Sequence, residues 1–170
     1  ASHEWLISLN KKSKLKGFAI YKKLSNPYFD KMVRDIRSKF DAFLINTKEA
    51  IPKMEENFAN NIFATYGFAS DQSPRVAVTM YWRKFMGITV PVHVGPENLA
   101  KRFDMNVVFC KITRVKRGFY SCTFELLSEN VKEIPDYQIT DQYTHLVEKQ
   151  ILEAPEFYMW THKRWKHRKN

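Results

Sequence analysis

The sequence of 170 residues contains 44% hydrophobic and 15% aromatic residues, which suffices for a globular core and excludes a disordered chain. Its 28 Lys and Arg residues outnumber 18 Asp and Glu residues, and the net charge of +10 favours anionic partners. Charge alone does not choose between lipid phosphates, nucleic acid and an acidic carrier protein. The length predicts a single domain over residues 1–170, and the apolar runs are too short for a bilayer span, so we expect any membrane contact to be peripheral.

The first part of the sequence alternates short apolar runs with helical patterns. Runs typical of buried strands cover residues 17–21, 42–45 and 62–69. Asn26-Pro27 predicts the N-cap and first position of a helix, and a second helix is expected to begin near Pro52. The first helix carries apolar residues at three- and four-residue steps, which predict one apolar face: Phe29, Met32, Val33, Ile36 and Phe40.

The second part of the sequence predicts four further elements. They are an extended segment over 76–87, a short helix over 95–103, a β-hairpin formed by 106–115 and 119–127, and a long helix that opens at Pro135-Asp136 and stops at Pro155. Strands separated by helices favour an α/β fold, a layered domain with a mainly parallel sheet flanked by helices. Because ligands bind where the strands of such sheets end, residues 22–23, 71–72 and 90–96 are candidate site segments.

The sequence offers no pattern for a metal or a bound cofactor, and we expect neither. Cys110 and Cys122 match no zinc spacing and fall on neighbouring apolar runs, so we interpret them as reduced core thiols. No glycine-rich phosphate loop is present among the five glycines.

Residues 147–168 combine the end of a helix, a proline, an aromatic cluster and a basic tail, which suits a membrane surface, a phosphorylated lipid or a nucleic acid. The order of these residues resembles the C-terminal signature of the bacterial lipid A biosynthesis acyltransferases, a V-E-x-x-I helix followed by A-P-E-x-Y-x-W-x-H-x-R-[FW]-K-x-R. The matching residues are Val147, Glu148, Ile151, Ala154, Pro155, Glu156, Tyr158, Trp160, His162, Arg164, Trp165, Lys166 and Arg168.

The resemblance implies a glycerolphosphate-acyltransferase-like fold within the lysophospholipid acyltransferase superfamily. It also implies transfer of a fatty acyl chain from an acyl thioester to a hydroxyl of a lipid A precursor, in lipopolysaccharide biosynthesis at the cytoplasmic face of the bacterial inner membrane. The donor would be acyl carrier protein or acyl-CoA.

Two inner motifs extend the resemblance. Residues 21–27 are similar to the family's Y-R-P-x-x-N-P element, with Lys22 and Lys23 in place of arginine and proline; a lysine keeps the charge but loses the bidentate geometry. Residues 69–72 resemble the A-x-D-[QH] turn beside the active site, so Asp71 would orient a basic partner or a substrate hydroxyl. The plainer interpretations are solvated loop lysines and an ordinary Asp turn.

The catalytic element of the family is H-x4-[DE], in which the histidine is a general base and the acid orients it. None of His3, His93, His145 and His162 has an acid at this spacing. The opening Ser2-His3-Glu4-Trp5 resembles the end of the element, so the resemblance implies that Glu4 is the acid. Its histidine would then lie upstream of Ala1, and the 170 residues alone would be inactive. The alternative is that residues 1–3 are a cloning remnant and Glu4 is a surface acid.

The implied substrates are anionic, because lipid A precursors carry phosphates and acyl carrier protein is acidic. Cationic side chains are therefore candidate contacts for substrate phosphates or for an anionic membrane. They are Lys22, Lys23, Arg34, Arg37, Arg75, Arg164 and Arg168, together with Lys163 and Lys166. Two alternatives remain open at this point: a basic nucleic-acid-binding module, for which no recognition motif is found, and an acyltransferase that acts on another membrane lipid.

Overall fold

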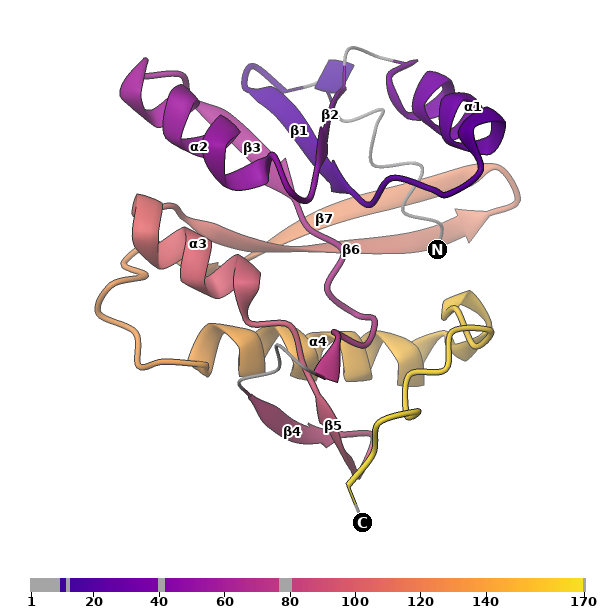
Figure 1. Ribbon diagram of the computed structural model, residues 1–170. Coiled ribbons are helices and arrows are strands. Elements are labelled where there is room, and N and C mark those ends of the chain that lie inside the picture. Colours follow the sequence, from indigo (N-terminus) through magenta and orange to yellow (C-terminus); the bar gives the residue numbers. More distant parts are fainter. Residues whose placement is uncertain (1–9, 12, 40–41, 77–80, 170) are drawn as a thin grey trace. The chain divides into compact units, whose positions relative to one another are not determined.

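The computed structural model describes residues 10–11, 13–39, 42–76 and 81–169 (Figure 1). The chain divides into two compact units. We call Ser2–Ala69 the N-terminal unit and Ser70–Asn170 the C-terminal unit, and describe each by itself.

The N-terminal unit is built on a small parallel sheet. The central strand β1 (Lys16–Tyr21) pairs in parallel with β2 (Phe43–Asn46) on one side and with β3 (Ala64–Gly67) on the other. This arrangement confirms the three strands expected from the apolar runs. The core of the unit consists of one residue from each of three neighbouring elements, with partly buried side chains around them: Phe18, Ile45 and Ala50, packed by Ile20, Ala64 and Tyr66.

Two helices connect these strands. Helix α1 (Pro27–Arg37) begins as predicted, because the side-chain oxygen of Asn26 accepts hydrogen bonds from the backbone N–H groups of Tyr28 and Phe29 at 3.0 and 3.1 Å. Helix α2 (Ala50–Ala59) begins two residues before the expected Pro52. A proline fits there because the N–H groups of the first helical turn have no partner within the helix.

The C-terminal unit opens with a hairpin that the sequence predicted only as an extended segment. Strands β4 (Trp82–Phe85) and β5 (Ile88–Pro91) pair antiparallel. Residues 77–80 of the expected segment lie outside the described residues. The turn residues Met86 and Gly87 have positive φ angles of 50° and 80°, which is the geometry of a two-residue hairpin turn. The backbone N–H of Met86 donates a hydrogen bond to the carboxylate of Glu148, which fixes the strained residue.

The remaining elements follow the predicted order. They are α3 (Gly95–Phe103), the antiparallel hairpin of β6 (Val107–Lys116) and β7 (Phe119–Ser128), α4 (Gln138–Glu153) and the short 3₁₀ helix η4 (Pro155–Phe157). A buried cluster joins the first hairpin, the second hairpin and α4: Phe85, Val90, Phe109, Val147 and Ile151.

The α/β class holds for this chain, but the expectation of a mainly parallel sheet needs correction. Parallel pairing is confined to the three strands of the N-terminal unit, while β4 to β7 form two antiparallel hairpins. The short turns at Met86-Gly87 and Arg117-Gly118 explain this, because a two-residue connection can join only antiparallel neighbours. Across the described residues, no helix has the length and apolar character needed to cross a bilayer.

Candidate active site

The turn that carries Asp71 is bonded to residues 158–169, which we call the closing segment. Ser73 makes two hydrogen bonds to it: its hydroxyl donates to the backbone carbonyl of Arg164 at 2.7 Å, and its backbone N–H donates to Nε2 of His162 at 3.0 Å. The phenol of Tyr158 donates to the backbone carbonyl of Asp71 at 3.5 Å. Residues about ninety positions apart in the sequence are therefore bonded on both sides of the turn.

Arg164 is the centre of this arrangement, and only 1% of its surface is exposed. One guanidinium nitrogen donates to the backbone carbonyl of Pro91 at 2.9 Å and lies 3.4 Å from the hydroxyl of Ser73. The guanidinium carbon lies 4.9 Å from the ring centroid of Phe85, an arrangement that favours a cation–π contact. Among the described atoms, Nε of Arg164 has no hydrogen-bond partner.

This burial differs from the surface role that the sequence suggested for Arg164. A side chain within the interior cannot reach the phosphate of a lipid or of a carrier protein without leaving its place. The physical reason is that the backbone carbonyl of Pro91 accepts a hydrogen bond from the guanidinium and the ring of Phe85 packs against it, and these contacts stabilise Arg164 inside the unit.

The charge of Asp71 affects the pKa values of two tyrosines, Tyr143 and Tyr158. Burial raises the pKa of Tyr143, and the carboxylate of Asp71 raises it further. The same two causes, in the same order, raise the pKa of Tyr158 to about 12. Both phenols therefore stay protonated at neutral pH, and they can donate hydrogen bonds beside the carboxylate.

Two histidines of the C-terminal unit have lowered pKa values. Burial and then the positive charge of Arg164 lower the pKa of His93, against an opposing effect of Asp71. Burial, Lys166 and Arg164 lower the pKa of His162, whose Nε2 accepts the Ser73 hydrogen bond. A neutral imidazole at His162 fits this acceptor role, because a protonated ring would have no free lone pair.

The structure places most of the other predicted site residues within one unit or the other. Lys22 and Lys23 are exposed in the loop after β1, and Arg34 and Arg37 lie on α1, all within the N-terminal unit. Arg75 and Arg168 are exposed in the C-terminal unit, and Glu4 lies outside the described residues. Of the predicted residues, the structure brings together Asp71 and Arg164.

Sequence reasoning missed several members of the cluster. His93 entered only as a histidine that lacks an acid at the H-x4-[DE] spacing, and Tyr143 falls in the predicted long helix but belongs to no motif. Tyr158 belonged to the signature that pointed to the family, but its contact with the Asp71 turn had no signal within the sequence. Among the described residues, no three His, Cys, Asp or Glu side chains gather as a metal site would require.

Within the C-terminal unit, the carboxylate of Asp71 thus interacts electrostatically with two protonated phenols, with two imidazoles of lowered pKa and with a buried guanidinium, and such a group of perturbed titratable residues marks a candidate functional site. In a comparison with protein families, the model described as "Bacterial lipid A biosynthesis acyltransferase" matches residues 5–167. The chain belongs to this family. A search of curated proteins found no match.

Proposed function

We propose that this protein transfers a fatty acyl chain from an acyl thioester to a hydroxyl of a lipid A precursor. The observation that carries the proposal is the family match over residues 5–167, which includes Asp71 and the closing segment that holds its turn. The family match supports a lipid A acyltransferase kind of function.

The chemistry needs a base, an oriented hydroxyl and a thioester. A histidine base takes the proton of the acceptor hydroxyl, and the oxygen attacks the thioester carbonyl to form a tetrahedral intermediate. The intermediate collapses with cleavage of the carbon–sulfur bond, which leaves an ester and a thiol that receives the proton. We assign Glu4 as the acid that orients the base, and Asp71 as the group that orients the acceptor hydroxyl or the base.

The partners follow from this reaction. The donor is acyl carrier protein or acyl-CoA, the acceptor is a phosphorylated lipid, and the site of action is the cytoplasmic face of the bacterial inner membrane. Cationic side chains remain candidates for contacts with the phosphates: Lys22, Lys23, Arg34, Arg75 and Arg168, which are exposed, and Arg37, which is partly buried. Arg164 is not proposed for this role, because it is buried.

The test uses the complete reading frame that encodes this chain, expressed in membranes, with acyl-carrier-protein and acyl-CoA donors and a lipid A precursor as acceptor. We expect Asp71→Asn to lower turnover by at least about tenfold, and Glu4→Ala to do the same, since each removes a group that orients a reacting partner. The matched control is Glu129→Gln, an exposed acid in the C-terminal unit, which should keep turnover. Unchanged turnover in either site variant would remove that residue from the mechanism.

A further inference from the structure

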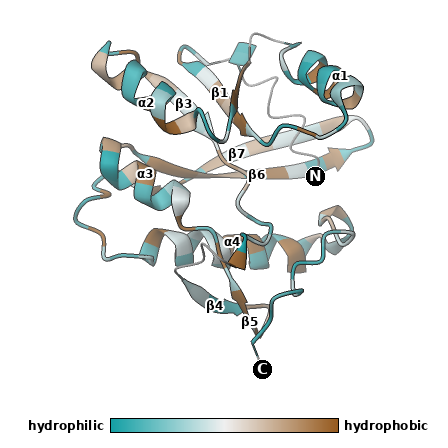
Figure 2. Ribbon diagram, in the orientation of Figure 1, coloured by the Kyte–Doolittle hydropathy of each residue, from teal (hydrophilic) through white to brown (hydrophobic). Residues whose placement is uncertain are grey.

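Helix α1 carries an apolar stripe on its outer surface. The stripe consists of Tyr28, Phe29, Met32 and Ile36, whose exposed fractions are 85%, 57%, 45% and 42%. Their spacing places them on adjacent turns of one side of the helix. The helix instead buries Asp30, at 4% exposure, and Figure 2 shows hydrophobic and hydrophilic residues side by side along α1.

The predicted apolar face of α1 does not contribute to the core of the unit. The core cluster of the N-terminal unit contains Phe18, Ile45 and Ala50 and includes no residue of α1. Phe40, the last expected member of the face, lies outside the described residues. Large apolar side chains that share one exposed surface are unfavourable in water, and such a patch usually marks a binding surface.

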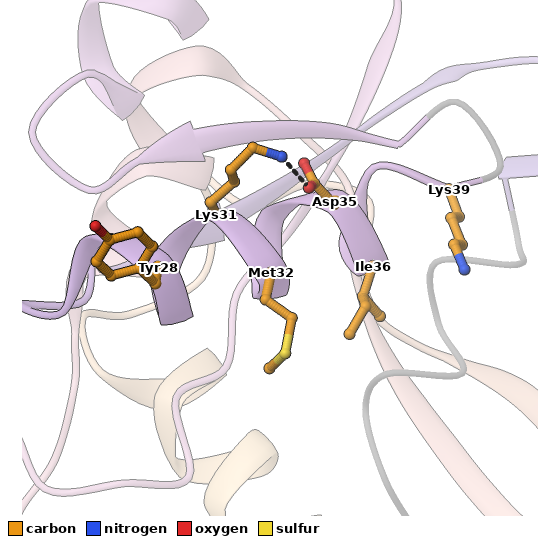
Figure 3. A pocket seen from close by; sticks show the side chains of 6 residues that line it. All are labelled: Tyr28, Lys31, Met32, Asp35, Ile36 and Lys39. Carbon is orange, nitrogen blue, oxygen red and sulfur yellow. Dashed lines mark hydrogen bonds and ion pairs between the residues drawn. The ribbon is translucent and has the colours of Figure 1, made fainter.

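The rim of the stripe is charged. A hollow beside α1 is lined by Tyr28, Met32 and Ile36 together with Lys31, Asp35 and Lys39, whose side chains are drawn in Figure 3. The ammonium group of Lys31 lies 2.7 Å from the carboxylate of Asp35. Lysine stems are apolar, so these side chains can lie along an apolar surface while their charged ends reach a polar layer.

Positive charge dominates the helix and the loop before it. Residues 22–39 contain six Lys and Arg residues and two Asp residues. Of the two acids, Asp30 is buried and accepts a hydrogen bond from the backbone N–H of Leu24 at 2.9 Å, and Asp35 is paired with Lys31. The surface around the stripe therefore presents excess positive charge.

Helix α2 of the same unit provides the contrast. It also exposes apolar side chains, Ile51 at 41% and Phe58 at 65%. Residues 48–60, however, contain three Glu and two Lys residues, so apolar exposure there is not accompanied by positive charge. The two features coincide on α1 and not on α2.

We propose that α1 is an interfacial helix that lays its stripe on an anionic lipid bilayer. An apolar face between cations fits the boundary between acyl chains and anionic headgroups, where burial and charge attraction add. Nucleic acid fits less well, because the exposed aliphatic side chains Met32 and Ile36 offer nothing to a phosphate backbone. The inference deepens the proposed function, since it names the surface that brings the protein to its lipid acceptor, but binding is measured without any acyl transfer.

The test is co-sedimentation of the 170-residue chain with vesicles of phosphatidylcholine alone or mixed with phosphatidylglycerol. The double variant Met32→Ser/Ile36→Ser should lower affinity for the anionic vesicles by at least about tenfold, because two apolar side chains no longer enter the bilayer. The matched control Ile51→Ser/Phe58→Ser removes comparable exposed residues from α2 and should bind as the parent does. Binding by the parent chain should weaken as salt concentration rises.

Three results would overturn the inference. The first is equal vesicle binding by the α1 and α2 variants. The second is a melting temperature lowered by several degrees in the α1 variant with vesicle binding intact, which would make the stripe a packing face. The third is binding of the parent chain to oligonucleotides in preference to anionic vesicles. The two proposals can fail separately. If the α1 variant loses vesicle binding but the product of the complete reading frame shows no acyl transfer, the inference about α1 is supported and the proposed function is wrong.

Discussion

Arg164 shows how a cation from a basic tail becomes an internal support. Its guanidinium bonds the carbonyl of Pro91 and contacts Phe85 and Ser73, so it joins the first hairpin to the Asp71 turn. Arg164→Ala should lower the free energy of unfolding by about 3 kcal/mol, because it leaves a cavity and a buried carbonyl without a partner. Urea denaturation measures this difference.

The control for this prediction is Arg168→Ala, four residues further on and exposed, which should change stability by less than about 0.5 kcal/mol. Arg164→Lys should lie between the two, since a lysine keeps the charge but not the planar geometry. A change in Arg164→Ala as small as that in Arg168→Ala would contradict the supporting role.

His93 predicts how stability depends on pH. Burial and then Arg164 lower its pKa in the folded protein, so the unfolded chain binds more protons just below the usual histidine pKa. The free energy of unfolding should therefore fall as pH drops below about 6.5. In His93→Gln the free energy of unfolding should fall less steeply with pH. The slope should differ from that of the parent by the equivalent of less than one bound proton, in urea titrations between about pH 7 and pH 5. The exposed His145 serves as the control, and an equal change in His145→Gln would contradict the assignment.

At the residue scale, the sequence predicted the groups that belong to motifs and missed those that meet only in the fold. Asp71 and Arg164 were identified from family-like patterns. His93 and Tyr143 reach Asp71 because β5 and α4 pack in one unit, and no local pattern carries that information. The exposure of a side chain is also not readable locally, which is why Arg164 was assigned to the surface.

Helix α4 begins on a carboxylate from another element. Glu97 of α3 is 3% exposed and accepts hydrogen bonds from the backbone N–H groups of Tyr137 and Thr140 at 2.7 and 2.8 Å. The hydroxyl of Thr140 donates to the same carboxylate at 2.6 Å. The charge lies at the positive end of the helix dipole, so Glu97 replaces the missing side-chain cap.

Removal of this cap should destabilise the C-terminal unit. Glu97→Ala leaves several buried donors without an acceptor and should lower the free energy of unfolding by about 3 kcal/mol. The exposed Glu133→Ala should change it by less than about 0.5 kcal/mol. Thermal unfolding followed by circular dichroism compares the two variants, and similar melting temperatures would show that Glu97 does not cap α4.

At the element scale, turn chemistry decided what could be predicted. The β6–β7 hairpin was expected from alternating strands around a turn with Gly118, whose φ is 80°, and it is confirmed. The β4–β5 hairpin was missed because Met86 occupies a left-handed position that Asn, Asp or Gly usually fills. The apolar periodicity predicted helix α1 correctly. Periodicity does not indicate, however, whether the apolar face of a helix packs in the core or remains exposed.

Over the whole chain, cations occupy two kinds of place. Arg164 of the C-terminal unit is buried, with 1% of its surface exposed. Other cations are exposed, among them Lys22 and Lys23 before α1 in the N-terminal unit, and Arg168 and Lys169 in the C-terminal unit, where the ammonium of Lys169 lies 4.1 Å from the ring centroid of Trp82. Composition predicted an anionic partner but not this division, since the two classes of cation have the same formal charge.

The closing segment has a consequence for how the protein is made. Its partners, Ser73, Phe85 and Thr89, precede it by about eighty residues or more, and the backbone N–H of Lys169 still donates to the carbonyl of Thr89 at 3.0 Å. Contacts of such long sequence separation form late, after the hairpin that receives them. The turn that holds Asp71 therefore stays unsupported on the ribosome until residues 158–169 have emerged, and the nascent polypeptide cannot complete its polar cluster before synthesis of this stretch has ended.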